Sequence, residues 1–131
     1  MRRAIPPRHH QVEIEIDGQK TEVDAGVAPL VLALSELPEL YTASSCECDD
    51  SDGLAWVDFN PEEGHDRADL ADLLDALQGR LRDSAAWGYF TMHWGLPGDD
   101  CPIGELRCDS QSIGKLSQCI SRFAKGRQAK K

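Results

Sequence analysis

The sequence lacks long apolar runs. No segment approaches the roughly 20 consecutive apolar residues that a membrane-spanning helix needs. The first eleven residues carry positive charge and two prolines but no apolar stretch, so they do not resemble a secretory signal. We therefore expect a cytoplasmic protein with no membrane partner, in which the five cysteines stay reduced. A complete set of disulfides is also disfavoured, because an odd number of cysteines leaves one thiol over.

Familiar catalytic and cofactor motifs are missing as well. The chain contains no Gly-x-Gly-x-x-Gly, Walker loop, Gly-x-Ser-x-Gly or His-Glu-x-x-His pattern. The acidic run at 49–52 is followed by Gly53, but it does not fit a calcium-binding EF-hand, because the first and twelfth ligands would be Cys48 and Phe59. The motifs therefore indicate no particular reaction.

Acidic and basic residues are unevenly distributed along the chain. The formal net charge is −9, from 23 acidic and 14 basic residues. Residues 1–10 and 121–131 contain eight basic residues and no acidic one, so residues 11–120 have a net charge of −17. An acidic body repels phosphate backbones and argues against a nucleic-acid partner. The basic ends could bind an anionic partner, but such ends more often serve solubility.

Alternating hydrophobicity near the N-terminus predicts a β-hairpin. Val12, Ile14 and Ile16 alternate with acidic residues, which is the period of a half-buried strand. Asp17-Gly18 favours a two-residue turn, because glycine accepts the positive φ that such a turn requires. We expect the chain to return as a second strand through Thr21 and Val23.

The order of a hairpin followed by a helix recurs twice more. Apolar residues at helical spacing predict helices over 30–37, 70–81 and 113–123. Further strands are predicted over 41–46, 54–59, 86–94 and 103–108.

The start of the middle helix has its own local pattern. Asn60 and Pro61 resemble an N-cap followed by proline at the first helical position. Glu62, Glu63 and Asp66 form an acidic cluster, and we expect them to complement the dipole of the first helical turn. Catalysis by two carboxylates would need a pair facing across a cleft, and the sequence selects no such pair.

These elements predict an α+β fold with the order ββαββαββα. Hairpins followed by helices favour a two-layer sandwich, in which a mostly antiparallel sheet carries the helices on one face. We expect one domain over residues 12–125, with a flexible tail over 1–11 and a basic tail over 126–131. The order of the strands in the sheet cannot be read from the sequence.

The strand over 86–94 is rich in aromatic residues. Trp87, Tyr89 and His93 share one face of this strand, because side chains alternate along a strand. One face must pack on the helices. If the face with Trp87, Tyr89 and His93 is uncovered, it offers an aromatic platform to a ligand or partner. If helices and loops cover both faces, these residues belong to the core.

Cysteine and histidine residues suggest a metal site as an alternative. Cys46, Cys48, Cys101 and His65 could together supply the four thiolate or imidazole ligands of a zinc ion. The chain has one Cys-x-Cys and no second pair, whereas zinc sites usually have two. Buried cysteines otherwise act as small hydrophobic residues. Acidic neighbours of Cys46 and Cys48 disfavour a thiolate, and so argue against a nucleophilic cysteine.

One stretch resembles known proteins. Residues 37–46 read LPELYTASSC, and an acidic turn and the strand AWVDF follow. The stretch resembles small uncharacterised bacterial domains in which a Leu-Pro turn leads to a strand ending in Ser-Cys-x-Gly. It is also similar to a Tyr-Thr-Thr-Ser-Ser-Cys-x-Gly segment of the tRNA wybutosine-synthesis methyltransferase family, with Cys48 in place of the glycine. The resemblance implies an α+β fold with Ser44, Ser45 and Cys46 near a ligand site.

The sequence thus leads to three hypotheses about function. The first is a non-catalytic binding or protein-interaction module with a protein or small-molecule partner, since no catalytic constellation is recognisable. The second is a zinc-binding or redox domain built on the cysteines. The third, implied by the resemblance alone, is an enzyme related to tRNA modification.

Overall fold

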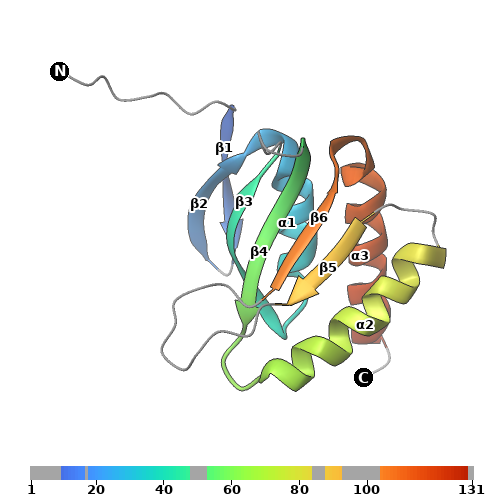
Figure 1. Ribbon diagram of the computed structural model, residues 1–131. Helices are drawn as coiled ribbons and strands as arrows, with labels where there is room; N and C mark the ends of the chain where they lie inside the picture. Colours follow the sequence, from blue (N-terminus) through green and yellow to red (C-terminus); the bar gives the residue numbers. More distant parts are fainter. Residues whose placement is uncertain (1–9, 17, 48–52, 84–87, 93–103, 130–131) are drawn as a thin grey trace.

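The computed structural model describes residues 10–16, 18–47, 53–83, 88–92 and 104–129 (Figure 1). The strands and helices, in chain order, are β1 (Gln11–Ile16), β2 (Gln19–Asp24), α1 (Ala28–Ser35), β3 (Leu40–Cys46), β4 (Leu54–Pro61), α2 (Arg67–Asp83), β5 (Gly88–Met92), β6 (Gly104–Asp109) and α3 (Ile113–Ala129). Short 3₁₀ turns precede α1 and α3. The predicted α+β class and element order are confirmed. Within the described ranges, no helix is long and apolar enough to span a membrane.

The strands form two antiparallel sheets. β1 pairs with β2 in a hairpin, and the other four strands form a sheet in the order β3-β4-β6-β5. We expected a single sheet, and this expectation is wrong for the hairpin. No backbone hydrogen-bond ladder among the described strands joins the hairpin to the main sheet. Instead, the side chains of Ile14, Ile16 and Val23 attach the hairpin by packing against the core around α1.

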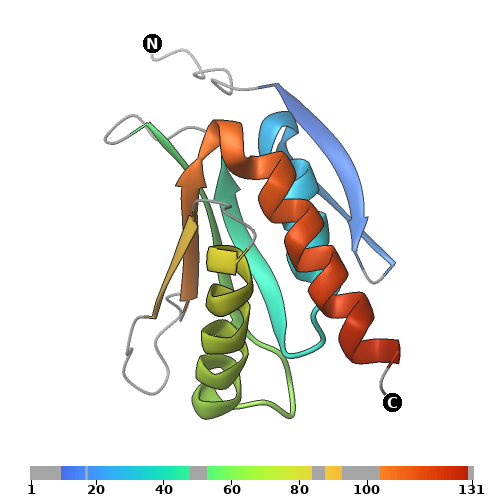
Figure 2. The same ribbon diagram turned by 90° about the vertical axis from the view of Figure 1, so that its right-hand side faces the viewer.

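The three helices of the described residues lie on one face of the four-stranded sheet (Figure 2). The sheet contributes Val57, Phe59 and Leu106, each with no exposed surface, to the core beneath the helices. The predicted leucine stripe of α2 is buried, and so are Ile113, Leu116 and Ile120 of α3. Among the described elements, none covers the other face of this sheet, which we call the open face.

The predicted start of α2 at Pro61 is wrong. Asn60 and Pro61 extend β4 and pair with β3. Proline has no backbone N–H to donate, and it is tolerated at position 61 for a simple reason. The pairing of β6 with β4 ends at Phe59, so no residue of β6 lies beside Pro61 to accept a hydrogen bond from it. The helix begins six residues later. Asp66 Oδ1 accepts a hydrogen bond of 2.9 Å from the Asp69 amide, and the Asp69 carboxylate accepts one of 3.3 Å from the Asp66 amide. This reciprocal cap marks the helix start.

The end of α3 differs from the expected domain boundary. The helix continues to Ala129, past residue 125, where we expected the domain to end. At the other end of the domain, the backbone amide of Ala25 donates a hydrogen bond of 2.7 Å to the carbonyl of His10. This bond fixes the start of the hairpin beside the turn that leads into α1.

Candidate functional site

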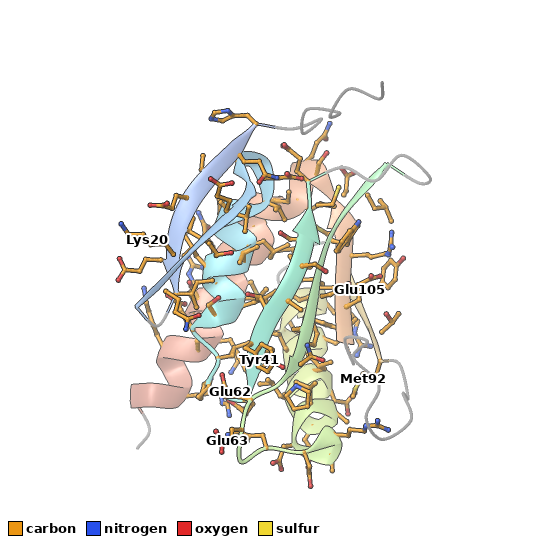
Figure 3. The ribbon with its side chains drawn as sticks, turned by 90° about the vertical axis from the view of Figure 1, so that its left-hand side faces the viewer. Lys20, Tyr41, Glu62, Glu63, Met92 and Glu105 are labelled. Atoms are coloured by element: carbon orange, nitrogen blue, oxygen red, sulfur yellow. The ribbon has the colours of Figure 1, made fainter. Side chains whose placement is uncertain are left out.

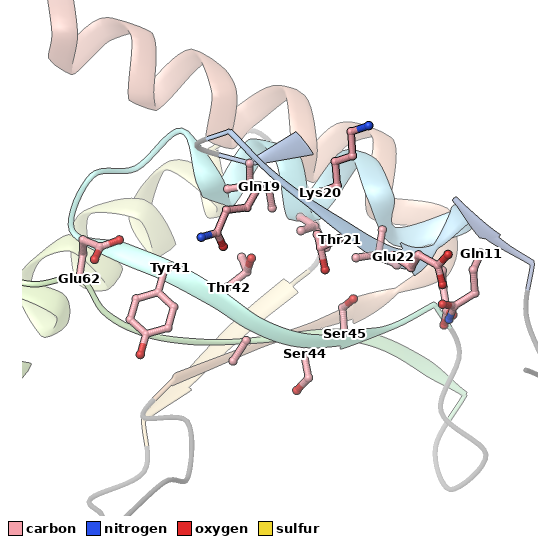
Figure 4. Close-up of a pocket in the computed structure, with 15 residues that line it drawn as sticks. Gln11, Gln19, Lys20, Thr21, Glu22, Tyr41, Thr42, Ser44, Ser45 and Glu62 are labelled. Carbon is pink, nitrogen blue, oxygen red and sulfur yellow. The ribbon is translucent and has the colours of Figure 1, made fainter. Parts of the chain in front are cut away.

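A groove separates the hairpin from the four-stranded sheet (Figure 4). It has a volume of about 740 Å³ and lies between β2 and β3, and we call it the β2–β3 groove. Helix α1 connects the two strands, which therefore run in the same direction (Figure 3). The polar residues that line the groove are Gln11, Gln19, Lys20, Thr21, Glu22, Asp24, Tyr41, Thr42, Ser44, Ser45 and Glu62.

The groove has an apolar floor and hydroxyl-bearing walls. Val31 of α1 is 2% exposed and, together with the half-buried Val23, provides apolar surface at the bottom. Thr21 points from β2 toward β3, whereas Thr42 and Ser45 point from β3 toward β2 (Figure 4). A ligand in the groove would therefore meet apolar surface below it and hydrogen-bonding groups on both sides.

Each wall of the groove is also the edge of a strand. Among the described residues, β2 has β1 as its single paired neighbour, and β3 has β4. The amide of Glu47, just beyond β3, donates a hydrogen bond to Asp24 of β2, so it points across the groove. Because backbone groups alternate in direction along an antiparallel strand, those of Ser45 point toward the same edge. Among the described residues, the strands on either side of the groove thus each keep one unpaired edge, and an unpaired edge readily accepts another strand.

Asp24 closes one end of the groove. Its side chain is buried, at 6% exposure, and accepts a hydrogen bond of 2.8 Å from Gln11 Nε2 and one of 3.0 Å from the Glu47 amide. Gly26 leaves room for Glu47, because a Cβ at Gly26 would lie 2.1 Å from a carboxylate oxygen of Glu47. The hairpin, the turn into α1 and the end of β3 are therefore held together at this point.

The groove is negatively charged. Glu22, Asp24 and Glu62 line it, and Lys20 is the one basic residue among the described residues that do so. Lys20 Nζ lies 3.8 Å from a carboxylate oxygen of Glu13 on β1, so its charge is partly compensated within the hairpin. A basic ligand is the electrostatic complement of this lining.

The open face of the sheet carries a row of four neighbouring side chains across all four strands. The strand pairings place Cys46 beside Trp56, Trp56 beside Arg107 and Arg107 beside Tyr89. Tyr89 is 38% exposed. Three strand spacings separate Cys46 from Tyr89, which is roughly 14 Å. The sheet thus places the two residues on one face but at its two opposite edges.

The predicted ligand-binding residues divide between these two surfaces. Ser45 lines the groove. Ser44 also borders the groove, but its hydroxyl lies on the open face, where it donates a hydrogen bond of 3.2 Å to Asp58 Oδ2. They differ in direction because side chains alternate along β3. Trp87 and His93 lie outside the described residues.

The proposed zinc ligands are only partly described. Cys46 pairs with Trp56 at one end of the ladder between β3 and β4, and His65 follows Pro61 beyond the other end. The structure therefore does not bring Cys46 and His65 together; His65 Nδ1 instead lies 3.4 Å from Asp69 Oδ2. Cys48 and Cys101 lie outside the described residues. Within the described part of the chain, no group of three or more metal-binding side chains converges.

The sequence did not point to Gln19, Thr21 or Thr42 as binding residues. Short polar residues in strands carry no signal of their own, and the walls of the groove come from segments on either side of α1.

Comparison with protein families, curated proteins and solved structures gives no match to the chain. The assignment of a site therefore depends on the geometry of the groove.

Proposed function

We propose that the protein is a non-catalytic binding module that takes an extended, basic segment of a partner protein into the β2–β3 groove. The observation that carries this proposal is that β2 and β3, which border the groove, each have one edge that pairs with no other described strand. An extended segment in the groove could form backbone hydrogen bonds with one of these edges. Addition of a strand to an exposed sheet edge is a common mode of peptide recognition.

The lining of the groove supports an extended segment with alternating side chains. In a strand, successive side chains point to opposite faces. Every second side chain of the bound segment would then rest on the floor formed by Val23 and Val31, and the others would point to solvent. Small apolar or β-branched residues fit the floor positions, because they combine strand propensity with apolar surface.

Charge supports a basic partner. Glu22 is exposed on β2, and Glu62 lies beside the opposite end of the groove from Asp24, so lysine or arginine side chains of the segment would meet a carboxylate at either end. Attraction between the acidic groove and a basic segment would speed association and would weaken as salt screens it.

Selection from a library of random dodecapeptides tests the proposal. We expect enriched peptides with alternating β-branched residues and at least one lysine or arginine. Thr21→Trp should abolish their binding, because the indole would occupy the groove from an exposed position on β2. Thr91→Trp is the matched control, since Thr91 is also an exposed strand threonine but lies on β5, away from the groove.

Methylation of the peptide backbone tests the mode of binding. One version of an enriched peptide is methylated at its odd-numbered amides and another at its even-numbered amides. One of the two versions should bind about tenfold more weakly or worse. A lost backbone hydrogen bond costs about 1 kcal/mol, and each methylated position adds to the loss. Equal binding by the methylated and unmethylated peptides, or binding that persists in Thr21→Trp, would contradict the proposal. Failure to enrich any peptide would also contradict it.

A further inference from the structure

A second groove, of opposite charge, lies between α2 and α3, which pack side by side (Figure 2). Its volume is about 650 Å³. Arg80 near the end of α2 and Lys115 and Arg122 of α3 line it, and we call it the basic groove. The other lining residues are Asp83, Gln118, Cys119, Phe123, Gly126 and Arg127.

The three cations of the basic groove are not neutralised within the described structure. Arg80, Lys115 and Arg122 are exposed, and none of them forms an ion pair with a described carboxylate. Arg127, by contrast, is engaged by Glu39. Asp83 is the single acidic residue among the described residues of the lining. Such a cluster is notable in a chain with a net charge of −9.

Helix dipoles do not account for all of this charge. Arg80 lies in the last turn of α2, where a cation interacts favourably with the helix dipole. Lys115 occupies the third position of α3, and the first turn of this helix contains no acidic residue. The helix dipole does not favour a cation near a helix N-terminus, so it gives no reason for the position of Lys115.

We propose that the basic groove binds a small phosphate-bearing ligand with an apolar or aromatic body. Arginine and lysine side chains are the usual ligands of phosphate oxygens. The half-buried Cys119 and Phe123 provide apolar surface between the cations, and the volume is typical of a site for a small molecule. This inference is independent of the β2–β3 groove.

The size of the ligand follows from the charge of the whole protein. A long nucleic acid would extend beyond the groove over an acidic body, which repels it. A small ligand stays beside the cations that line the groove, and salt screens the more distant acids beyond roughly 8 Å. The groove therefore favours a small anion over a polynucleotide.

Titration of the protein with pyrophosphate and with ADP, followed by amide chemical shifts, tests the proposal. Both should shift the amides of α3 around Lys115 and Arg122. ADP should bind more tightly, because its base can pack against the apolar part of the lining around Cys119. Lys115→Gln should weaken both by about tenfold, the cost of one charge-assisted hydrogen bond. Lys125→Gln is the matched control, since Lys125 is an exposed lysine of α3 outside the groove.

Several results would overturn this proposal. The first is the absence of shifts at millimolar pyrophosphate and ADP. The second is an equal effect of Lys115→Gln and Lys125→Gln, which would indicate attraction to overall charge. Equal affinities for pyrophosphate and ADP would show that the apolar surface of the groove does not contribute to binding. Tighter binding of a single-stranded RNA oligonucleotide through the same residues would replace the small ligand with a polynucleotide.

Discussion

The Asp24 carboxylate accepts a hydrogen bond of 3.0 Å from the backbone amide of Glu47, a residue 23 positions further along the chain. The bond joins the last residue of β2 to the residue that follows β3, and so it sets the closed end of the β2–β3 groove. A second bond to the same carboxylate, from Gln11, ties β1 to this point. One buried side chain thus positions the hairpin relative to the sheet.

Replacement of Asp24 tests this role. We expect Asp24→Ala to lower the free energy of unfolding by about 2 kcal/mol, because two hydrogen bonds to a carboxylate are lost. Glu22→Ala, an exposed position on the same strand, should change it by less than about 0.5 kcal/mol. Urea denaturation measures both values. Similar effects of the two substitutions would show that Asp24 does not anchor the hairpin.

Gly104 and Phe59 form a close contact that leaves no room for a methyl group. A Cβ at Gly104 would lie 2.2 Å from Cε2 of the fully buried Phe59 ring. Gly104 also pairs with strands on both sides, so it cannot move away. Gly104→Ala should therefore cost about 3 kcal/mol of stability. Gly79→Ala, in the interior of α2 with open space around it, should instead stabilise the protein by about 0.5 kcal/mol. Thermal denaturation distinguishes the two signs.

Cys108 should make stability fall at alkaline pH. Burial, and secondarily the neighbouring Asp109 carboxylate, raise the pKa of its thiol from 9.0 to about 11. Between these values the unfolded chain releases a proton that the folded chain retains. The contribution of Cys108 is therefore constant below about pH 9 and is lost as the pH rises toward 11.

Comparison with Cys108→Val, which retains an apolar side chain, measures this effect. Urea denaturation at about pH 8 and about pH 10.5 should show a larger loss of stability for the wild type than for the variant, since valine has no proton to release. Parallel pH profiles would mean that the thiol is not held in its neutral form by the fold.

Glu39 and Arg127 form an ion pair that ties the end of α3 to the turn before β3. Glu39 is 6% exposed, and Arg127 Nη1 donates a hydrogen bond of 3.0 Å to Glu39 Oε1 while Nη2 donates to Oε2. The variants Glu39→Gln, Arg127→Met and their combination form a double-mutant cycle. We expect a coupling free energy of about 1 kcal/mol. Methionine preserves packing beside Phe123, over which the guanidinium lies 5.5 Å from the ring centre. Additive effects in denaturation would exclude a direct interaction.

Local sequence patterns predicted most of the elements. The alternation in β1 and the leucine stripe of α2 are properties of short segments, and both patterns match the structure. Gly18 has φ of 80°, as the predicted hairpin turn requires. The start of α2 was wrong because Asn60 and Pro61 fit two local structures equally well. Pairing with β3, a contact with a distant segment, selects the strand.

The candidate site was predicted less completely. Ser45 was singled out and lines the groove, but Thr21 and Thr42 were not, since a threonine in a strand is unremarkable by itself. The open face that carries Tyr89 was one of two alternatives that the sequence left open. Tyr89 is 38% exposed on the face opposite the three described helices, whereas Trp87 and His93 lie outside the described residues.

The sequence alone determined most of the strands and helices and which of their faces are apolar, because these properties depend mainly on neighbours within a few residues. Tertiary structure decided the strand order, the separation of the hairpin from the main sheet, and both grooves. Each of these depends on how distant segments pack against α1 or α3, and the free energy of that packing is a property of the assembled core.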